Sequence, residues 1–245
     1  GFRLYEKWGA DSEFWHWDPW EDESYDTMGD RAVLLQSIQN YRAIHATQQF
    51  EGFPATDDVC LTEPRFGEQL IVDIPEGQEV CLGDIYGVPG GKLKIQVTGP
   101  RKPCKYLDMK NNTKYGLRGI RHHTRDRALA GWFCAVLQEG RLKEGQSLQL
   151  EQRLHPEWTM AEIATAVFAE GSRREIMMGK ASWSRSIFQL QELVNLKYLI
   201  DYEWKEDLRA ILRRMKKHLG LLPDIKIAKY SPFVLIPIIA TCIIP

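Results

Sequence analysis

The segment from Phe66 to Leu150 constrains the fold most, because it consists of short strand-like runs that end at glycine- or proline-containing turns. The runs are EQLIVDI, EVCLGDIYGV, KLKIQVTG, GWFCAVL and QSLQLEQRL. In KLKIQVTG, Ile95 and Val97 alternate with polar residues, as in a half-buried strand. GWFCAVL is apolar on both sides and is expected to lie centrally in the sheet. Many short strands at this spacing predict a β-barrel or sandwich.

Helical periodicity replaces this pattern after His155. Thr159–Glu162, TMAE, has the spacing of a capping box and predicts a helix through about Phe168. SWSRSIFQLQELVNL predicts a second helix, and apolar residues at helical spacing after Asp201 predict a third that ends before Gly220. Near the front, DRAVLLQSIQNYRAIH predicts a short strand and then a helix from about Ser37.

The chain is therefore expected to be mainly β with α and to divide into four parts. These are an irregular N-terminal segment (1–25), a β-barrel domain (26–154), a small three-helix C-terminal appendage (155–222) and an apolar, poorly ordered tail (223–245). The last fourteen residues are apolar but include three prolines. They are too few for a membrane-spanning helix, which needs about 20 residues, so no membrane span is expected.

Charge is balanced overall but not locally. The net charge of −1 argues against nucleic acid or an anionic membrane as a partner for the whole surface. Residues 11–30 contain eight acids and no Lys or Arg, whereas residues 101–127 contain nine Lys or Arg against Asp108 and Asp126. A basic run of this kind is either a solvated face or the site of a bound anion.

The five cysteines form no CxxC pair, which disfavours a disulfide scaffold, a zinc ribbon or an iron–sulfur cluster held by this chain. Reduced thiols fit an intracellular, cytoplasmic protein. Cys60, Cys81 and Cys134 lie in or near apolar strand patterns and are interpreted as packing residues.

Cys104 differs from these, because it follows Pro103 in a stiff loop beside Arg101, Lys102 and Lys105. Nearby cations favour the thiolate form of a cysteine, which is the form that attacks electrophiles and binds metals. A small buried apolar residue is the alternative. The local pattern leaves both interpretations open.

Three blocks in this order carry a resemblance to a known family: FGEQLIVD (66–73), VCLGDIYGVPGGKLKIQVTGPRKPCKYLD (80–108) and AGWFCAVLQEGRLKEGQSLQL (130–150). Together they resemble the molybdenum cofactor sulfurase C-terminal, or MOSC, domain family. DRAVLLQS resembles the DRAV segment of that family, and the helical tail resembles the appendage of bacterial members that reduce N-hydroxylated bases. The resemblance covers roughly residues 26–219.

The resemblance implies a mostly antiparallel MOSC-type β-barrel that binds a molybdenum cofactor (Mo-molybdopterin). The cysteine of the family's motif maps onto Cys104, which would ligate molybdenum and act as the catalytic residue. A soft thiolate suits such a metal. Candidates for holding the pterin and its phosphate are Arg31, Arg101, Lys105, Arg118 and Arg121; for each, an ion pair or a solvated position is the alternative.

The chain departs from the family pattern in two places. Relatives carry a glycine-rich HGG before DRAV, where this chain reads YDTMGDRAV and keeps Gly29 alone, and the family's HY is Asn40-Tyr41 here.

Two further motifs have open roles. The pair His122-His123 could act as a general acid, with a surface position as the alternative. Asp84 is interpreted as a turn residue that bonds nearby backbone.

The sequence therefore favours a molybdenum-dependent oxidoreductase that removes oxygen from an N-hydroxylated small molecule of the hydroxylaminopurine or amidoxime type. The chain has no GxGxxG motif and no cluster-type cysteine set, so a separate electron-donating reductase is implied. The alternative is a non-redox module that carries the cofactor, or a sulfur on Cys104. A single-strand nucleic-acid binder using the basic run and its tyrosines is disfavoured by the net charge. The oligomeric state is left open.

Overall fold

The computed structural model of this chain describes residues 2–5, 9–10, 31–47, 50, 53, 64–115, 118–168, 187–199, 201–218 and 220. The strands are β1 (Phe2–Tyr5), β2 (Gly9–Ala10), β3 (Val33–Ser37), β4 (Leu70–Val72), β5 (Ile85–Gly87), β6 (Lys94–Pro100), β7 (Trp132–Gln138), β8 (Gly140–Leu142) and β9 (Gln149–Gln152). The helices are α1 (Ile38–His45), α2 (Lys105–Tyr115), α3 (Ile120–Asp126), α4 (Met160–Phe168), α6 (Ile187–Asn195) and α7 (Asp201–His218).

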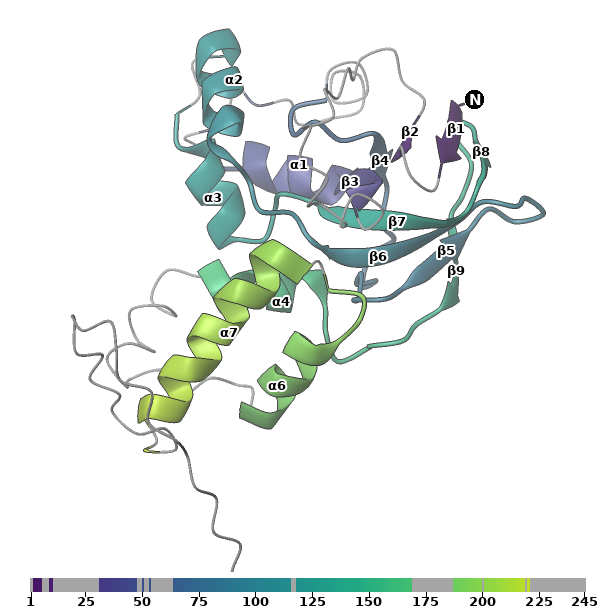
Figure 1. The fold of residues 1–245 in the computed structure, drawn as a ribbon. Helices are drawn as coiled ribbons and strands as arrows, with labels where there is room; N and C mark the ends of the chain where they lie inside the picture. The colour runs from purple at the N-terminus through teal and green to yellow at the C-terminus, as the bar shows by residue number, and fades with distance from the viewer. Residues whose placement is uncertain are drawn as a thin grey trace, which may run out of the picture.

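The main sheet is a curled half-barrel. Over the described strands its order is β4-β3-β7-β6-β5-β9, and every neighbouring pair is antiparallel except β3 and β4. A small antiparallel sheet, β2-β1-β8, lies beside it (Figure 1). The predicted mainly β fold with α helices is confirmed, and GWFCAVL does lie centrally, because β7 pairs with both β3 and β6.

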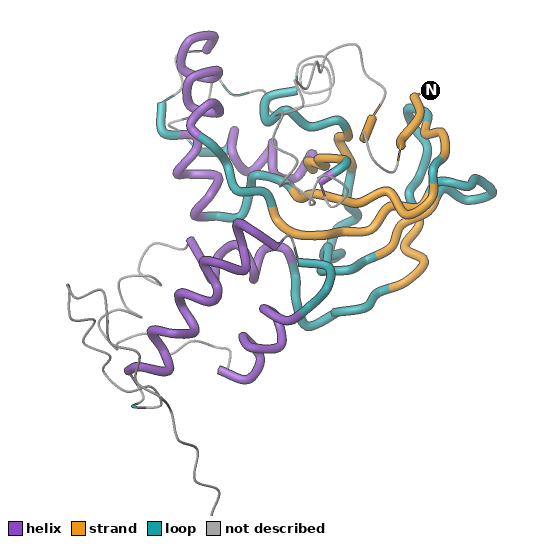
Figure 2. The backbone as a smooth tube through the Cα atoms, in the orientation of Figure 1, coloured by secondary structure: helices purple, strands orange, loops and turns teal. Residues whose placement is uncertain are grey.

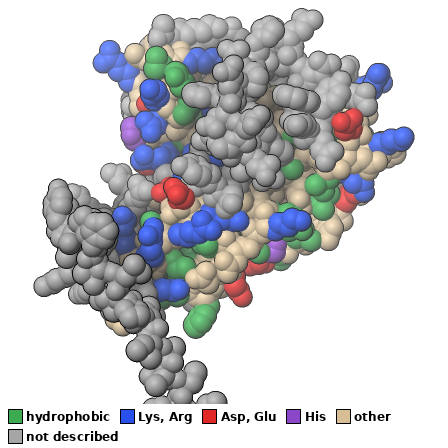
Figure 3. All heavy atoms as spheres, viewed as in Figure 1, with side chains coloured by type: hydrophobic (Ala, Val, Ile, Leu, Met, Phe, Trp, Pro, Cys, Tyr) green, Lys and Arg blue, Asp and Glu red, His purple; other side chains and the backbone are tan. Residues whose placement is uncertain are grey.

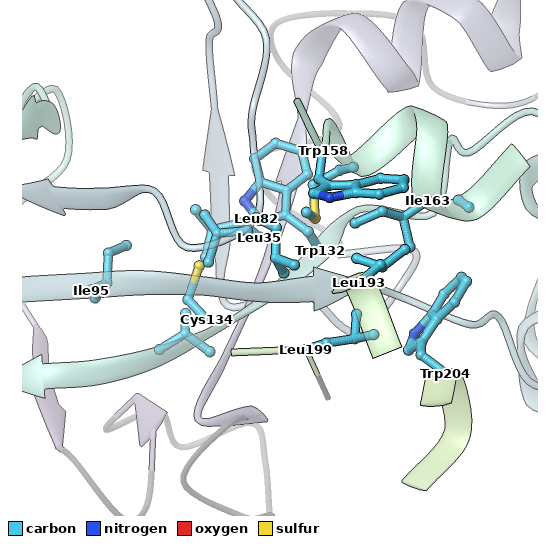
Figure 4. Packing of buried hydrophobic residues seen from close by; sticks show 14 of the residues in the cluster. Leu35, Leu82, Ile95, Trp132, Cys134, Trp158, Ile163, Leu193, Leu199 and Trp204 are labelled. Carbon is cyan, nitrogen blue, oxygen red and sulfur yellow. The ribbon is translucent and has the colours of Figure 1, made fainter. Parts of the chain in front are cut away.

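The sheet and the C-terminal helices share one hydrophobic core. It includes Leu35, Cys134 and Trp158 from the barrel side and Ile163 and Trp204 from the helices, each at most 6% exposed. Figure 4 shows these side chains facing one another between sheet and helices. The helices predicted after Thr159 therefore form, and they pack onto the sheet (Figure 2).

Two helix starts form as their sequence signals predict. Ser37 is the N-cap of α1, and its Oγ accepts a hydrogen bond from the Asn40 N–H at 3.1 Å. At the start of α4, the Glu162 N–H donates to Thr159 Oγ1 at 3.1 Å, and the Thr159 N–H donates back to the Glu162 carboxylate at 3.2 Å. This is the reciprocal capping box predicted from TMAE.

Three expectations need correction. The segment 1–25, predicted to be irregular, contains β1 and β2; β1 pairs with β8 more than 130 residues later, so no local pattern reveals it. The segment 80–84 is not regular strand, since Cys81 forms only an isolated bridge with Thr159. The region interpreted as strands also contains α2 and α3. Helix α2 has no continuous apolar stripe, and of its described side chains only Leu107 and Asn111 are buried.

Within the described part of the chain, no helix combines the length and apolar character needed to cross a membrane. The remainder of the segment 1–25, the tail 223–245, Cys60 and the residues just before Arg31 lie outside the described residues.

Candidate functional site

Cys104 lies at the end of the loop that connects strand β6 to helix α2. The chain leaves the sheet at Pro100, runs through Arg101–Cys104 without regular structure, and enters α2 at Lys105. The Cys104 carbonyl accepts the Leu107 N–H at 3.1 Å, so the cysteine lies immediately before α2 and is joined by this bond to its first turn. Its side chain is exposed, whereas the thiols of Cys81 and Cys134 are buried. Among these three cysteines, only Cys104 offers a sulfur that a ligand can reach.

The loop of Cys104 is held from the sheet. The Arg101 N–H donates to the Gly131 carbonyl at 2.9 Å, directly beside the paired residues Pro100 and Trp132. Gly131 has a φ of 84°, and a Cβ at this position would meet the Leu35 carbonyl oxygen at 2.2 Å. Only glycine fits such a turn, so the backbone at residue 131 fixes where the loop starts.

The same loop is also held from α3. Arg121 Nε donates to the Pro103 carbonyl at 3.2 Å, and the Arg121 backbone N–H donates to Asp108 Oδ1 at 2.8 Å. Arg121, predicted as a phosphate ligand, therefore links the loop of Cys104, helix α2 and helix α3. Its position gives it a structural role next to the cysteine.

The C-terminal helices reach this loop through Lys102. Its Nζ forms an ion pair with Asp207 of α7 at 2.9 Å and lies 5.3 Å from the centre of the Trp204 ring. Trp204 is itself 1% exposed. Helix α7 is therefore connected directly to the segment that carries Cys104.

Arg101 lies over an aromatic ring whose position is fixed by buried polar contacts. Its guanidinium carbon is 6.0 Å from the centre of the Phe66 ring, which stacks edge-on to Tyr41 at 5.7 Å. The Phe66 N–H donates to the Glu68 carboxylate at 2.8 Å, and the Tyr41 hydroxyl donates to the same carboxylate. Glu68 is 3% exposed and Tyr41 fully buried. The second residue of the Asn40-Tyr41 pair therefore supports the ring beneath Arg101.

Arg31 meets the sheet at Phe133 of β7. Its guanidinium carbon is 5.5 Å from the centre of the Phe133 ring. Phe133 pairs with Leu34 on one side and with Gly99 on the other, two residues after Gly131. Arg31 and Arg101 thus both contact the first part of β7 or the residues leading into it, and both guanidinium groups lie over aromatic rings, a favourable cation–π arrangement.

The other two predicted basic residues lie at the start of α2 and just before α3. Lys105 is exposed, and its Nζ is 5.5 Å from the centre of the Tyr106 ring. Arg118 is exposed, its Nε donates to Asn112 Oδ1 at 3.3 Å, and it lines a cavity of about 250 Å³ between α2 and residues 118–119. A larger cavity of about 570 Å³ lies between α1, the 74–80 segment and the start of α4. Cys104 lines neither of these two cavities.

The paired histidines differ in environment. His122 is exposed and His123 is half-buried, with its ring 4.8 Å from that of Phe50. Burial and the nearby Arg127 lower the pKa of His123 below the usual histidine value. His123 is therefore neutral at physiological pH, which disfavours it as the proton donor considered from sequence.

Cys81 and Cys134 are packing residues, as predicted. Both belong to the main core and are at most 1% exposed. Burial, with a further contribution from Asp84, raises the pKa of the Cys81 thiol to about 11. Burial likewise raises the pKa of Cys134 far above the ordinary range. Neither thiol ionises near neutral pH.

These differences predict selective thiol chemistry. In the native protein Cys104 should react with iodoacetamide, while Cys81 and Cys134 should stay unmodified until the protein unfolds, because alkylation needs an accessible thiolate. Peptide mass spectrometry of protein treated with and without denaturant measures this. If Cys81 or Cys134 were alkylated in the native state as fast as Cys104, the packing described above would be wrong.

In the described part of the structure, no group of three carboxylate, imidazole or thiol side chains is placed to hold a metal ion.

The sequence did not reveal the aromatic rings under the arginines or the structural position of Arg121. Phe66 belongs to the FGEQ motif, so the sequence singled out this residue. Nothing in the sequence indicated, however, that the Phe66 ring contacts Arg101.

The comparisons with known proteins agree with this architecture. The MOSC domain model matches residues 17–149, more than half of the chain, and the protein belongs to the MOSC domain family. A protein named Reductase from Gibberella moniliformis (strain M3125 / FGSC 7600) is 29% identical over 104 residues, which are 42% of this chain and 18% of that protein. YflK, an uncharacterised protein from Bacillus subtilis (strain 168), is 31% identical over 93 residues, 38% of this chain and 39% of YflK. The chain spans less than half the length of either relative.

Two solved structures share the fold. The crystal structure of YiiM from Geobacillus stearothermophilus has a TM-score of 0.56 and 23% sequence identity, with 75% of this chain and 80% of that one covered. YiiM from Escherichia coli has a TM-score of 0.57 and 21% identity, with 92% and 89% covered. At these identities the likeness establishes the fold, including the C-terminal helices, and nothing more about activity.

Proposed function

We propose that this protein is a molybdenum-cofactor-dependent reductase of N-hydroxylated small molecules, such as hydroxylaminopurines or amidoximes. The observation that carries the proposal is the exposed Cys104 thiol on a loop held from three sides, within the residues that match the MOSC domain model and at the position onto which the resemblance maps the family's cysteine. A thiolate is a soft ligand that suits molybdenum.

The residues present fit such a cofactor. One accessible sulfur can supply one metal ligand, and the remaining ligands would come from the dithiolene of the pterin and from oxygen. The pterin also carries a phosphate, for which guanidinium groups are well suited because they can donate two parallel hydrogen bonds. Arg101 and Arg31 are assigned this role, since aromatic rings already orient both side chains.

Lys105, the first residue of α2, and Arg118, which precedes α3, are exposed and would add positive charge around this region. Arg121 would act by holding the Pro103 carbonyl, and so the loop of Cys104, in place. The bound cofactor supplies the two-electron oxygen-transfer chemistry. The chain would bind it, orient it through Cys104 and the arginines, and keep the metal-binding edge accessible to substrate.

The test is elemental analysis of protein purified from a host that makes the cofactor, together with reduction of 6-hydroxylaminopurine by a viologen donor. We expect about one molybdenum per chain and turnover that depends on it. Molybdenum-free protein from the same host would refute the proposal.

An exposed thiol also suits a carrier that holds the cofactor, or a sulfur atom, for another enzyme. The same experiment separates the two functions. A carrier would contain molybdenum, or release sulfide from Cys104 on reduction, yet reduce no N-hydroxylated substrate with the artificial donor.

A further inference from the structure

Helix α2 carries two large hydrophobic side chains that face solvent. Tyr106 is 63% exposed and Met109 is 56% exposed. They are three residues apart and so lie on the same face of the helix. A single exposed apolar side chain is common on protein surfaces, whereas neighbouring exposed apolar side chains with a polar rim are typical of interaction sites.

Cations surround this pair. Lys105, Lys110 and Arg118 are exposed on or beside α2. On the side of the molecule that Figure 3 shows, hydrophobic side chains over α2 have Lys and Arg side chains next to and below them. We call Lys105, Tyr106, Met109, Lys110 and Arg118 the α2 surface.

The α2 surface also has a hollow. A cavity of about 250 Å³ opens beside Met109 and is lined by Asp108, Asn112, Arg118 and Gly119 as well. Protein interfaces concentrate binding energy where a side chain enters such a recess at the centre of a charged rim. The α2 surface thus has an apolar centre, a recess and a basic rim.

The α2 surface adjoins Cys104 directly. Cys104 immediately precedes α2, and at 1.5 Å per residue Met109 lies about 8 Å further along the helix axis. A protein bound on the α2 surface would bring its own redox centre close to a metal on the Cys104 sulfur. Electron transfer falls steeply with distance, so this is a useful place for a donor.

We propose that the α2 surface is the docking site of an acidic electron-transfer protein, of the kind that carries an iron–sulfur cluster or a flavin; this inference rests on the proposed function. Charge complementarity with the basic rim selects an acidic partner and speeds its encounter. Small, weak interfaces with a few apolar contacts are typical of redox partners, which must also dissociate quickly.

The reaction needs such a donor. Reducing R–NHOH to R–NH₂ breaks the N–O bond, and the oxygen leaves as water. The step consumes two electrons and two protons. The docked partner would supply the electrons, one from each of two reduced iron–sulfur proteins or both from one flavin hydroquinone, and the protons would come from solvent.

Met109→Glu tests the docking site, because it puts a negative charge at the centre of the α2 surface, at a residue to which no role in cofactor binding is assigned. Phe188→Glu is the matched control: Phe188 is 81% exposed, also on a helix, but on α6. Met109→Leu should behave like the parent. Binding is measured calorimetrically with an acidic [2Fe–2S] ferredoxin and with an acidic flavodoxin, at low and high salt, using the cofactor-loaded full chain.

We expect Met109→Glu to weaken binding of at least one of these proteins about tenfold or more, and high salt to weaken binding by the parent. Phe188→Glu should bind like the parent, and all variants should reduce substrate equally with the viologen donor. Equal binding by Met109→Glu and the parent, or no binding of either redox protein by the parent, would overturn the proposal. So would tighter binding of a single-stranded oligonucleotide to the same surface.

Measuring turnover as well as binding tests the docking site and the proposed reductase function separately. If the redox protein binds through Met109 but the viologen donor drives no reduction, docking stands and the reductase assignment fails. If viologen drives reduction but Met109→Glu leaves redox-protein binding unchanged, the reductase assignment stands and the docking site is wrong.

Discussion

Replacing Cys104 with serine should remove molybdenum from the protein and abolish reduction of N-hydroxylated substrates, while leaving the fold intact. The serine hydroxyl stays protonated at neutral pH and is a harder ligand than a thiolate, so it binds this metal poorly. Changes one shell beyond a metal's ligands already cost about 10–100-fold in affinity or activity, so we expect loss of the ligand itself to cost about 100-fold or more. Molybdenum content and 6-hydroxylaminopurine reduction are the measurements.

Stability should not change in this variant, because Cys104 is exposed and the new hydroxyl can reach water. The controls are Cys81→Ser and Cys134→Ser, which bury a hydroxyl in the main core. An unpaired buried hydroxyl costs on the order of 1–3 kcal/mol. These two variants should therefore unfold more easily yet keep molybdenum and turnover. A Cys104→Ser protein with both metal and activity would show that this cysteine is not the ligand.

Structure determined by neighbouring residues was predictable from the sequence. The Ser37 cap, the capping box at Thr159 and the central position of the strand at Cys134 all follow from patterns only a few residues long. The helical spacing in α7 likewise identifies the face that packs into the core, because residues such as Trp204 and Leu208 recur on one side.

What the sequence could not supply depends on distant partners. Strand β1 forms by pairing with β8, and Phe66 is brought under Arg101 by the fold. Helix α2 was not predicted from the sequence, for a different reason. Its exposed Tyr106 and Met109 do not follow the usual pattern of a buried apolar stripe. Tyr106 and Met109, which depart from the buried-stripe pattern, are also the residues at the centre of the proposed docking site. Such departures are expected where a functional requirement competes with folding.

The candidate site was predictable only in part for the same reason. The motif identified Cys104 and its neighbouring cations, but the structure divides those cations among different contacts. Lys102 pairs with Asp207 of α7, and Arg121 bonds the Pro103 carbonyl. Spacing along the chain shows that charges are close in sequence, whereas which of them face a ligand depends on the helices packed around the loop.

Asp84 is the second position where a single substitution should have a large effect, and here the effect is on stability. Its carboxylate is fully buried and is bound by Arg153 through two hydrogen bonds, at 3.0 Å and 2.8 Å. It also accepts the Cys81 N–H at 2.9 Å, as expected for a turn residue, and the Tyr86 hydroxyl at 3.2 Å. Asp84 thus joins β5, the turn before it and the segment after β9.

Asp84→Asn should lower the free energy of unfolding by about 3 kcal/mol, measured by urea denaturation at neutral pH. Breaking a buried ion pair costs about 3–5 kcal/mol because the remaining charge loses its partner. The lower end applies because the Arg153 side chain is 33% exposed and can turn partly to water. The amide keeps the shape of the carboxyl group, so packing changes little and the measured loss reports on the charge.

Glu151→Gln is the matched control. Glu151 pairs with Lys94 at 2.6 Å, a shorter contact than either bond to Arg153, but both side chains are about 40% exposed. Exposed ion pairs contribute about 0–1 kcal/mol, since water screens the charges and long side chains lose freedom on pairing. The two variants each remove one negative charge near the β5–β9 edge of the sheet, so a difference between them isolates the effect of burial. Equal losses for Asp84→Asn and Glu151→Gln would mean that the Asp84 carboxylate does not hold these segments together.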